Sequence, residues 1–355
     1  MLFLIKGIYE MSKICYNNLT KQDEIRDFCV SENILSCHFA TAKAVLHYCG
    51  KKSLGFLHIW YNNSKRCFIM WIMYAFASAF FAGITAILSK IGIKNINSNL
   101  ATAIRTAVVL VFSWIIVFIC GTQTELVGID TKTLVFLILS GIATGASWLC
   151  YFKALQLGNV NEVAPIDKSS TILSMILAFI FLNEQISLLK IVCIVLIGTG
   201  TYLMIETKGT AAENSQKSGW LIWAILSAVF AALTSILGKI GIANVDSNLG
   251  TAIRTVIVLI MAWIVVFATK SQKELTIINR KNLFFLIISG IATGLSWLSY
   301  YKALQDGPAS IVVPIDKLSI LITIFFSVVV LKEKISKKSM FGLVLLTAGT
   351  LLLII

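Results

Sequence analysis

Long apolar runs alternate with short polar stretches from residue 71 to the end of the chain. Each run is about 20 residues long, which is the length an α-helix needs to cross a bilayer and is too long for a strand. The sequence therefore predicts an all-α membrane fold with ten transmembrane helices. The predicted segments are roughly 71–93, 98–119, 133–153, 163–182, 187–205, 220–242, 247–268, 282–302, 312–331 and 336–354.

The first five segments are repeated as the second five. A shift of 149 residues takes Arg105 to Arg254 and aligns 71–205 with 220–354 without a gap. About half of the aligned positions are identical, which indicates a tandem duplication. Because each copy has an odd number of spans, we expect two antiparallel, inverted five-helix repeats. Such repeats are typical of secondary transporters, whose substrate site lies near the midplane between the halves.

Two stretches fall outside the repeats at 70–205 and 220–355: an extension at 1–69 and a polar linker at 206–219. The extension contains all three histidines and five of the eight cysteines, without the spacing of a metal site. It has no signal-peptide pattern. We interpret it as a disordered or artefactual segment with Met70 as the natural start; a genuine peripheral tail is the alternative.

Composition and charge agree with a membrane protein. Hydrophobic residues make up 57% of the chain and charged residues only 13%, and the formal net charge is +13. No basic tract is interleaved with exposed aromatic residues, so we expect the positive charge to set topology and contact anionic lipids, with no nucleic-acid partner. The basic loops favour a cytoplasmic linker, with both termini outside.

The motif PIDK occurs in the fourth segment of both copies, at 165–168 and 314–317. Proline suits the first turn of a helix. We therefore expect both aspartates in that turn, where free N–H groups and the helix dipole stabilise a carboxylate. The adjacent lysines are not stabilised there, because the helix dipole disfavours a cation at an N-terminus. Neighbouring helical residues do not face each other, so one or both of each pair should have partners on other helices. The four residues are Asp167, Lys168, Asp316 and Lys317.

Among the other cations inside or at the ends of apolar segments, four are candidates for the site: Arg105, Arg254, Lys153 and Lys302. The arginines either snorkel back to the interface or face a cavity. The lysines end the third segments, where the helix dipole favours a cation and the interface is near. An interfacial position and a cavity position are both open for them.

The third segments also carry a repeated SGIATG motif followed by aromatic residues. Glycines four apart predict a close-packing helix face. The aromatic residues form either an interfacial belt or the wall of a pocket. The glycines are Gly141, Gly145, Gly290 and Gly294, and the aromatic residues are Trp148, Tyr151, Trp297 and Tyr300.

The duplication also excludes some chemistry. Neither repeat contains histidine, and the cysteines of one repeat do not align with cysteines of the other. No GxxxxGK[ST] motif is present, so ATP hydrolysis by this chain is not predicted. We expect no enzyme activity, no cofactor and no metal site. Glu184 and Glu333 follow the fourth segments, where the dipole opposes a carboxylate, and should pair with a cation or face water.

The chain resembles EamA-type members of the drug/metabolite transporter superfamily in three features. It has two tandem five-helix repeats, a lysine at the end of the first segment of each copy, and the acidic sequences FLNE and VLKE after the fourth segments. The resemblance covers about 71–354 and matches Glu184 and Glu333 to the family's acidic position. It implies a ten-helix inverted-repeat fold in a cell membrane, here the inner membrane of a bacterium. It also implies alternating-access movement of small organic solutes, often efflux. Family members commonly have both termini in the cytoplasm, opposite to the basic-loop count.

We therefore expect a secondary transporter with a polar cavity between the halves. Its cations outnumber its carboxylates, so the expected substrate is an anionic or zwitterionic metabolite, and lipids are the other expected partner. One alternative is a broad-specificity exporter of cationic drugs, whose cavity would be dominated by carboxylates and aromatic rings. Another is a membrane scaffold or lipid-handling protein that transports nothing.

Overall fold

A computed structural model describes residues 54–92, 96–157, 163, 166–204, 219–329 and 336–354. The chain divides into two units, Met1–Lys65 and Arg66–Ile355. The first unit is described only from residue 54, where helix α4 begins. The predicted extension up to residue 53 and nearly all of the predicted linker lie outside the described residues. The fold and the site below belong to the second unit.

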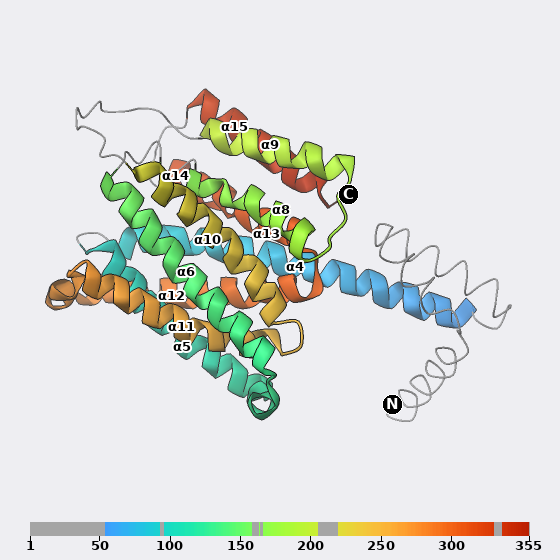
Figure 1. The fold of residues 1–355 in the computed structure, drawn as a ribbon, viewed down its shortest axis with the longest axis horizontal. Helices are drawn as coiled ribbons and strands as arrows, with labels where there is room; N and C mark the ends of the chain where they lie inside the picture. The colour runs from blue at the N-terminus through green and yellow to red at the C-terminus, as the bar shows by residue number, and fades with distance from the viewer. Residues whose placement is uncertain are drawn as a thin grey trace. The chain divides into compact units, whose positions relative to one another are not determined.

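The described residues of the second unit are helical, with no strand among them (Figure 1). Elements of the second copy follow those of the first at the predicted shift of 149 residues: α11 follows α5, η3 follows η2, and α15 follows α9. In chain order the elements are α4 (Leu54–Gly92), α5 (Ser98–Cys120), η2 (Thr122–Gly128), α6 (Thr131–Leu157), α8 (Ser170–Phe181), α9 (Leu188–Met204), α10 (Trp220–Gly241), α11 (Ser247–Ala268), η3 (Ser271–Ile277), α12 (Arg280–Asp306), α13 (Ala309–Lys317), α14 (Ser319–Val329) and α15 (Lys337–Leu352).

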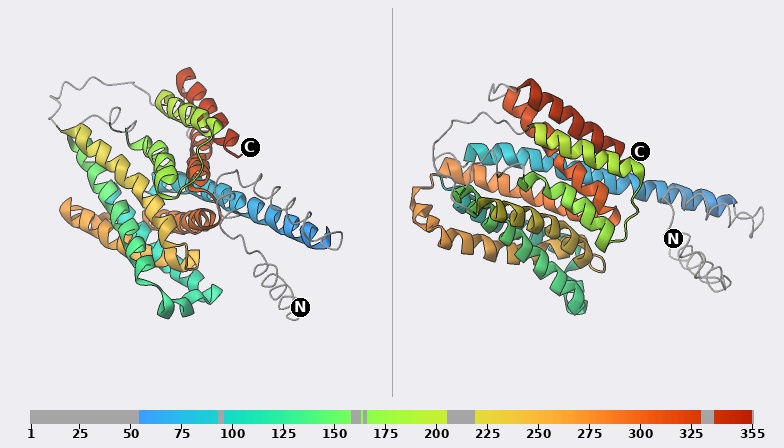
Figure 2. Two further views of the ribbon diagram at one scale, coloured as in Figure 1. Left: turned by 45° about the vertical axis from the view of Figure 1, so that its right-hand side comes forward. Right: turned by 45° about the horizontal axis from the view of Figure 1, so that its top comes forward.

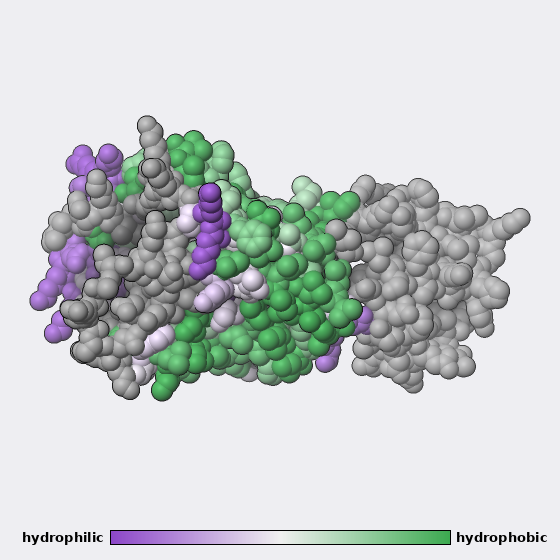
Figure 3. All heavy atoms as spheres, turned by 90° about the horizontal axis from the view of Figure 1, so that it is seen from above, coloured by the Kyte–Doolittle hydropathy of each residue, from purple (hydrophilic) through white to green (hydrophobic). Residues whose placement is uncertain are grey.

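Seven stretches of the described helices are long and apolar enough to cross a membrane, and α9 is a shorter apolar helix. The predicted count of ten is not reached by this measure because α8 has 12 residues and α15 has 16. Large apolar side chains such as Val111, Phe118 and Ile180 are exposed on the helices. Hydrophobic residues cover much of the described surface in Figure 3, and most hydrophilic ones lie at the left of this view, with a few near the centre and beside the grey atoms. This surface suits a lipid environment.

Corresponding helices of the two copies pack against each other in antiparallel pairs. Gly200 of α9 lies against Gly342 of α15, whereas Gly349, further along α15, lies against the earlier Cys193. The same two helices run side by side in both views of Figure 2. A Cβ added at Gly200 would come 2.6 Å from the carbonyl oxygen of Gly342, so the two backbones are nearly in contact.

The helices α5 and α11 form a second antiparallel pair, and side chains from the opposite copy cap both N-termini. Asn97, the N-cap of α5, donates its backbone N–H to Glu274 over 2.8 Å. Asp246, the N-cap of α11, donates in the same way to Glu125 over 2.9 Å. Each N-terminus therefore meets the loop that follows the C-terminus of its partner helix.

The fourth segment of the second copy differs from the prediction. Pro314 is not in the first turn: α13 begins at Ala309, so Pro314 lies inside the helix and is buried. Proline lacks an N–H and disturbs a helix from within. The hydrogen bonds after it shorten to i→i+3, from the Leu318 N–H to the Ile315 carbonyl over 2.9 Å. A turn at Leu318 then separates α13 from α14.

The first copy has a similar interruption after its PIDK motif. The Ser169 N–H donates to the Ile166 carbonyl over 3.1 Å, and α8 starts at Ser170. Pro165 lies outside the described residues. Asp316 is therefore about two turns after the start of its helix, α13, rather than in the first turn. The prediction that a helix N-terminus stabilises this aspartate is wrong.

Candidate functional site

The two PIDK aspartates are bonded to serines of the opposite repeat. Asp316 accepts a hydrogen bond from the Ser78 hydroxyl of α4 over 2.6 Å. Asp167 accepts one from Ser227 of α10 over 3.0 Å. Ser78 and Ser227 are themselves equivalent positions, so the two contacts are the same contact made twice. This confirms the expectation that partners would come from other helices.

A row of hydroxyl groups on each third helix continues these contacts. We call Ser140, Thr144 and Ser147 the α6 hydroxyl stripe, and Ser289, Thr293 and Ser296 the α12 hydroxyl stripe. Their spacing places each set on one helix face. Ser147 donates to the Ser227 carbonyl over 3.0 Å, and Ser296 donates to the Ser78 carbonyl over 3.1 Å. Each aspartate–serine contact therefore rests on one end of a hydroxyl stripe.

The PIDK lysines lie near each other. Lys168 is close enough to Lys317 for the two charges to oppose one another, while Asp167 attracts it. Its side chain is exposed. Lys317 is also exposed, and its Nζ lies 3.8 Å from Asp316 Oδ2. The prediction that neighbours in sequence would not face each other is wrong for this second pair.

The two arginines contact hydroxyl groups of the stripe in the opposite repeat, about one helical turn away from the stripe residue that contacts the aspartate's serine. Arg254 donates through Nη2 to Thr144 over 2.8 Å and through Nε to Ser140 over 3.3 Å. Arg105 donates through Nη2 to Thr293 over 3.3 Å. Arg254 is only 2% exposed, so snorkelling to the interface is excluded for it.

The aromatic candidates have different surroundings in the two copies. Trp297 lies under the Arg254 guanidinium, with its ring centroid 5.4 Å from Cζ. Tyr300 donates to Ser235 over 2.8 Å. Trp148 packs on a buried apolar cluster that includes Leu100. Tyr151 is half-buried, and its phenol interacts with the charge of Asp167.

The lysines that end the third helices are not part of this network. Lys302 pairs with Asp306, one turn away on the same helix, with a distance of 3.1 Å. Lys153 is exposed. Neither forms a hydrogen bond or ion pair with the aspartates or arginines above in the part of the chain that is described. The interfacial alternative therefore fits both.

Glu184, the acidic residue that follows the fourth segment of the first copy, caps a helix of the other repeat. Glu184 accepts hydrogen bonds from the N–H groups of Ala309 over 2.6 Å and Ser310 over 3.0 Å, at the start of α13. Its carboxylate lies 4.0 Å from Lys239 Nζ, which also donates to the Gly307 carbonyl. Free N–H groups and the dipole stabilise a carboxylate at a helix N-terminus. Glu333 lies outside the described residues.

Replacing Glu184 by alanine should loosen the start of α13. Loss of a capping side chain costs about 1 kcal/mol, so the amides of Ala309 and Ser310 should exchange with deuterium several-fold faster. Peptide-resolved hydrogen exchange in detergent measures this rate. Glu184→Gln should be intermediate because it keeps one acceptor oxygen. Glu125→Ala is the control, since Glu125 caps a different helix; equal exchange in all variants would contradict the capping role.

The SGIATG glycines lie at contacts between the repeats. A Cβ at Gly141 would come 2.7 Å from Ile257 of α11, and a Cβ at Gly145 would come 2.3 Å from Met261 of the same helix. The equivalent Gly290 and Gly294 lie in the same way against Val108 and Phe112 on α5, with distances of 2.7 and 2.6 Å. These small residues let each stripe-bearing helix approach the arginine-bearing helix of the other copy.

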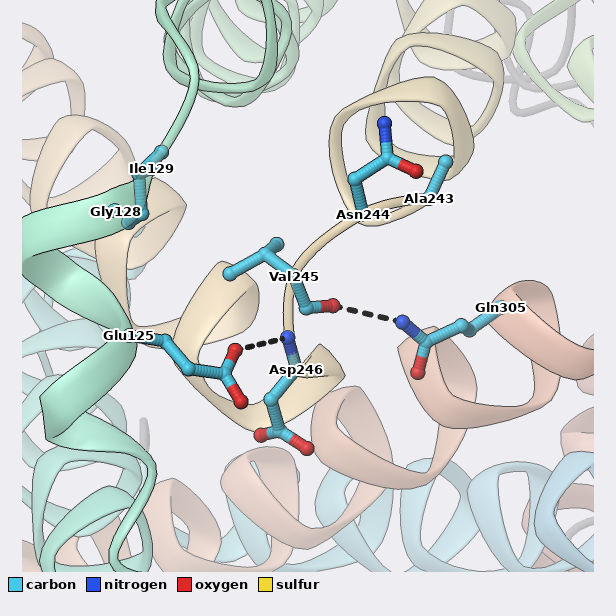
Figure 4. Close-up of a pocket in the computed structure, with 8 residues that line it drawn as sticks. All are labelled: Glu125, Gly128, Ile129, Ala243, Asn244, Val245, Asp246 and Gln305. Carbon is cyan, nitrogen blue, oxygen red and sulfur yellow. Dashed lines mark hydrogen bonds between the residues drawn. The ribbon is translucent and has the colours of Figure 1, made fainter. Parts of the chain in front are cut away.

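Two pockets among the described residues lie away from the PIDK residues. One, of about 520 Å³, is formed at helix ends by loops of both repeats (Figure 4). Glu125 accepts there from the Asp246 N–H, and Gln305 donates to the Val245 carbonyl over 2.7 Å. The other, of about 580 Å³, is an apolar groove lined by α4 and α14 residues such as Phe80 and Phe325. Neither contains a residue of the predicted site.

Sequence reasoning missed the hydroxyl groups that complete the site. Its search for costly groups in lipid considered charges and aromatic rings, and a serine in a helix costs little. The duplication contains the signal, because five hydroxyl positions around this site are among those that are identical in the two copies. These are Ser78/Ser227, Thr85/Thr234, Ser140/Ser289, Thr144/Thr293 and Ser147/Ser296.

Apolar helices around a duplicated polar interior define an integral, multi-pass membrane protein. The EamA-like transporter family matches residues 69–206 and 218–355, once in each repeat, and the chain belongs to this family. The resemblance predicted from the sequence is thereby confirmed.

The chain is also similar to curated relatives and to a solved structure. An uncharacterized transporter encoded in the cobO 3' region of Sinorhizobium sp. is 43% identical over 134 residues, which cover 38% of this chain and 95% of the relative. The uncharacterized protein MJ1333.1 of Methanocaldococcus jannaschii is 30% identical over 133 residues, covering 38% and 94%. A solved structure with a TM-score of 0.61 and 14% identity covers 80% of this chain and 96% of that one, and shares the fold.

Proposed function

We propose that this protein is a secondary transporter of a small anionic or zwitterionic organic solute, which works by alternating access and without enzymatic chemistry. The observation that carries the proposal is that Lys168 and Lys317, one from each repeat of a transporter-family chain, lie near enough for their charges to oppose one another. Like charges held near each other in a membrane protein are costly unless an anion approaches them. Each lysine has an aspartate nearby, but both lysine side chains are exposed, so they can still reach a solute anion.

The proposal includes ten spans in two inverted repeats. Three observations support the inversion. The helix pairs α5–α11 and α9–α15 are antiparallel; Asp246 meets the loop of Glu125; and Asn97 meets the loop of Glu274. The loop at 270–281 carries Lys270, Lys273, Arg280 and Lys281, so the positive-inside rule favours a cytoplasmic position for it. We propose the inner membrane of a bacterium as the location, with the solute and lipids as partners.

Flux into proteoliposomes tests this function. The probes are labelled pyruvate, phosphate, alanine and tetraphenylphosphonium, which represent carboxylate, phosphate, zwitterionic and cationic solutes. Wild-type protein should transport an anion or a zwitterion. The double variant Lys168→Gln/Lys317→Gln should reduce that flux at least about tenfold, since losing one charge-assisted contact costs about 1.5 kcal/mol or more. Lys281→Gln, which removes an exposed loop charge, is the control.

The other outcomes separate the alternatives. Flux of tetraphenylphosphonium alone would favour a cationic drug exporter and contradict the proposed substrate class. No flux of any probe would favour a scaffold or lipid-handling protein. If Asp167→Asn and Asp316→Asn leave flux unchanged in both directions, these aspartates have no role in coupling.

A further inference from the structure

The arginines of the two repeats occupy equivalent positions but have unequal surroundings. In a guanidinium group, Nε and Nη2 lie on the same edge and donate in the same direction. For Arg254 both of these atoms donate to the α6 hydroxyl stripe. Two rings cover the group as well: the Tyr301 centroid is 4.5 Å from Cζ and the Trp297 centroid is 5.4 Å away. This edge of Arg254 has no donor left for a ligand.

Arg105 is left with an unpartnered donor on the same edge. Its Nη2 contacts Thr293, but its Nε is buried and has no hydrogen-bond partner. No carboxylate within the described ranges forms an ion pair with it. A buried donor without a partner is costly, and a buried cation without a counter-charge is more so.

One substitution between the copies explains this difference. Ser289 is the residue that should accept from Arg105 Nε, as Ser140 does from Arg254. Its hydroxyl instead contacts the hydroxyl of Ser89 over 2.8 Å. In the second copy the position of Ser89 is Gly238, which offers no hydroxyl group. Ser140 there donates to the Thr234 carbonyl over 2.8 Å and accepts from its arginine.

Gly238 also makes room for the ring that covers Arg254. A Cβ at this position would come 2.6 Å from Cε1 of Tyr301. Tyr301 itself replaces Phe152 of the first copy. The absence of a side chain at Gly238 therefore leaves Ser140 without a competing hydroxyl and makes room for Tyr301, so that Arg254 is both hydrogen-bonded and covered by a ring.

We propose that Arg105, and not Arg254, binds the oxyanion group of the transported solute, and that Ser89 keeps this arginine available by engaging Ser289. The ligand chemistry rests on the proposed transport function. A carboxylate or phosphate oxygen at Nε would complete the guanidinium edge and supply the missing negative charge, which is the geometry in which arginine binds these groups most strongly. Arg254 instead joins α11 to α6 and α12.

Anion-dependent thermal stability of the full-length protein in detergent tests this assignment. The probes are acetate and phosphate, compared with chloride at equal ionic strength. In the wild type, at least one of the two should raise the melting temperature in a saturable way. Arg105→Gln should weaken the apparent affinity about 10- to 100-fold, because a charge-assisted hydrogen bond is lost. Ser89→Ala should weaken it about three- to tenfold by releasing Ser289 to Arg105.

Ser89→Ala keeps the arginine itself, so the test does not depend on whether Arg105→Gln folds. Arg254→Gln should lower the melting temperature but keep the anion-dependent rise. The proposal is overturned if the wild type shows no saturable rise, if Ser89→Ala binds as tightly as the wild type, or if only Arg254→Gln loses the rise. Anion binding without flux of any probe would refute the transport function and leave the site. Flux that Arg105→Gln does not change would refute the site and leave the function.

Discussion

Replacing Arg254 by methionine should lower the free energy of unfolding by about 3 kcal/mol. The variant loses two interhelical hydrogen bonds from a charged donor and two cation–π contacts, and these together account for about that amount. It also leaves the hydroxyls of Ser140 and Thr144 without their arginine partner. Thermal or SDS-induced unfolding of the purified protein measures the loss.

The equivalent variant of the first copy is the matched control. Arg105→Met removes the same side-chain atoms. The interactions lost with them are fewer, because Arg105 has the 3.3 Å contact to Thr293 and a donor that has no partner. Its loss should be about 1 kcal/mol or less. Equal losses for the two variants would contradict the view that the arginines differ in their structural role.

Adding one methyl group at Gly200 should destabilise the protein by about 2–3 kcal/mol, the typical cost of overpacking a tight contact. The Cβ of alanine would come 2.6 Å from both the Gly342 carbonyl oxygen and the Leu346 N–H nitrogen. These are backbone atoms of α15, so the clash is relieved only if α9 and α15 move apart. The same unfolding assay measures the effect.

Gly198→Ala, two residues earlier on α9, is its control. There the nearest atom to an added Cβ is Cδ1 of Ile172 at 2.8 Å, the end of a flexible side chain. Alanine is also a better helix former than glycine by about 1 kcal/mol. Gly198→Ala should therefore be neutral or slightly stabilising. If Gly200→Ala is equally well tolerated, the close contact of the two backbones does not hold α9 and α15 together.

The sequence was a good guide to the helices and to the duplication. Apolar runs of the length of a bilayer have few alternatives, and a gap-free shift of 149 residues relates the two copies directly. It was a poor guide to where the fourth helix begins. Pro314 suggested a start, but α13 begins at Ala309, where Glu184 of the other copy caps it. A cap supplied from 125 residues away leaves no local signal.

The charged residues of the candidate site were identified from the sequence, but their partners were not. Asp316 attracts attention because a carboxylate is costly in lipid, whereas Ser78 does not, although the two form one contact. The unequal states of Arg105 and Arg254 were also hidden. They depend on Gly238, a residue that acts through the side chain it lacks, on a helix that neither arginine belongs to.

The difference between Ser89 and Gly238 also bears on how such a chain evolves. Two identical subunits share one gene, so a substitution at this position would change both arginines at once. In a fused chain the two positions mutate separately, and one copy can be selected for binding while the other is selected for rigidity. A duplication that begins as mere repetition can thus lead to a division of labour between its halves.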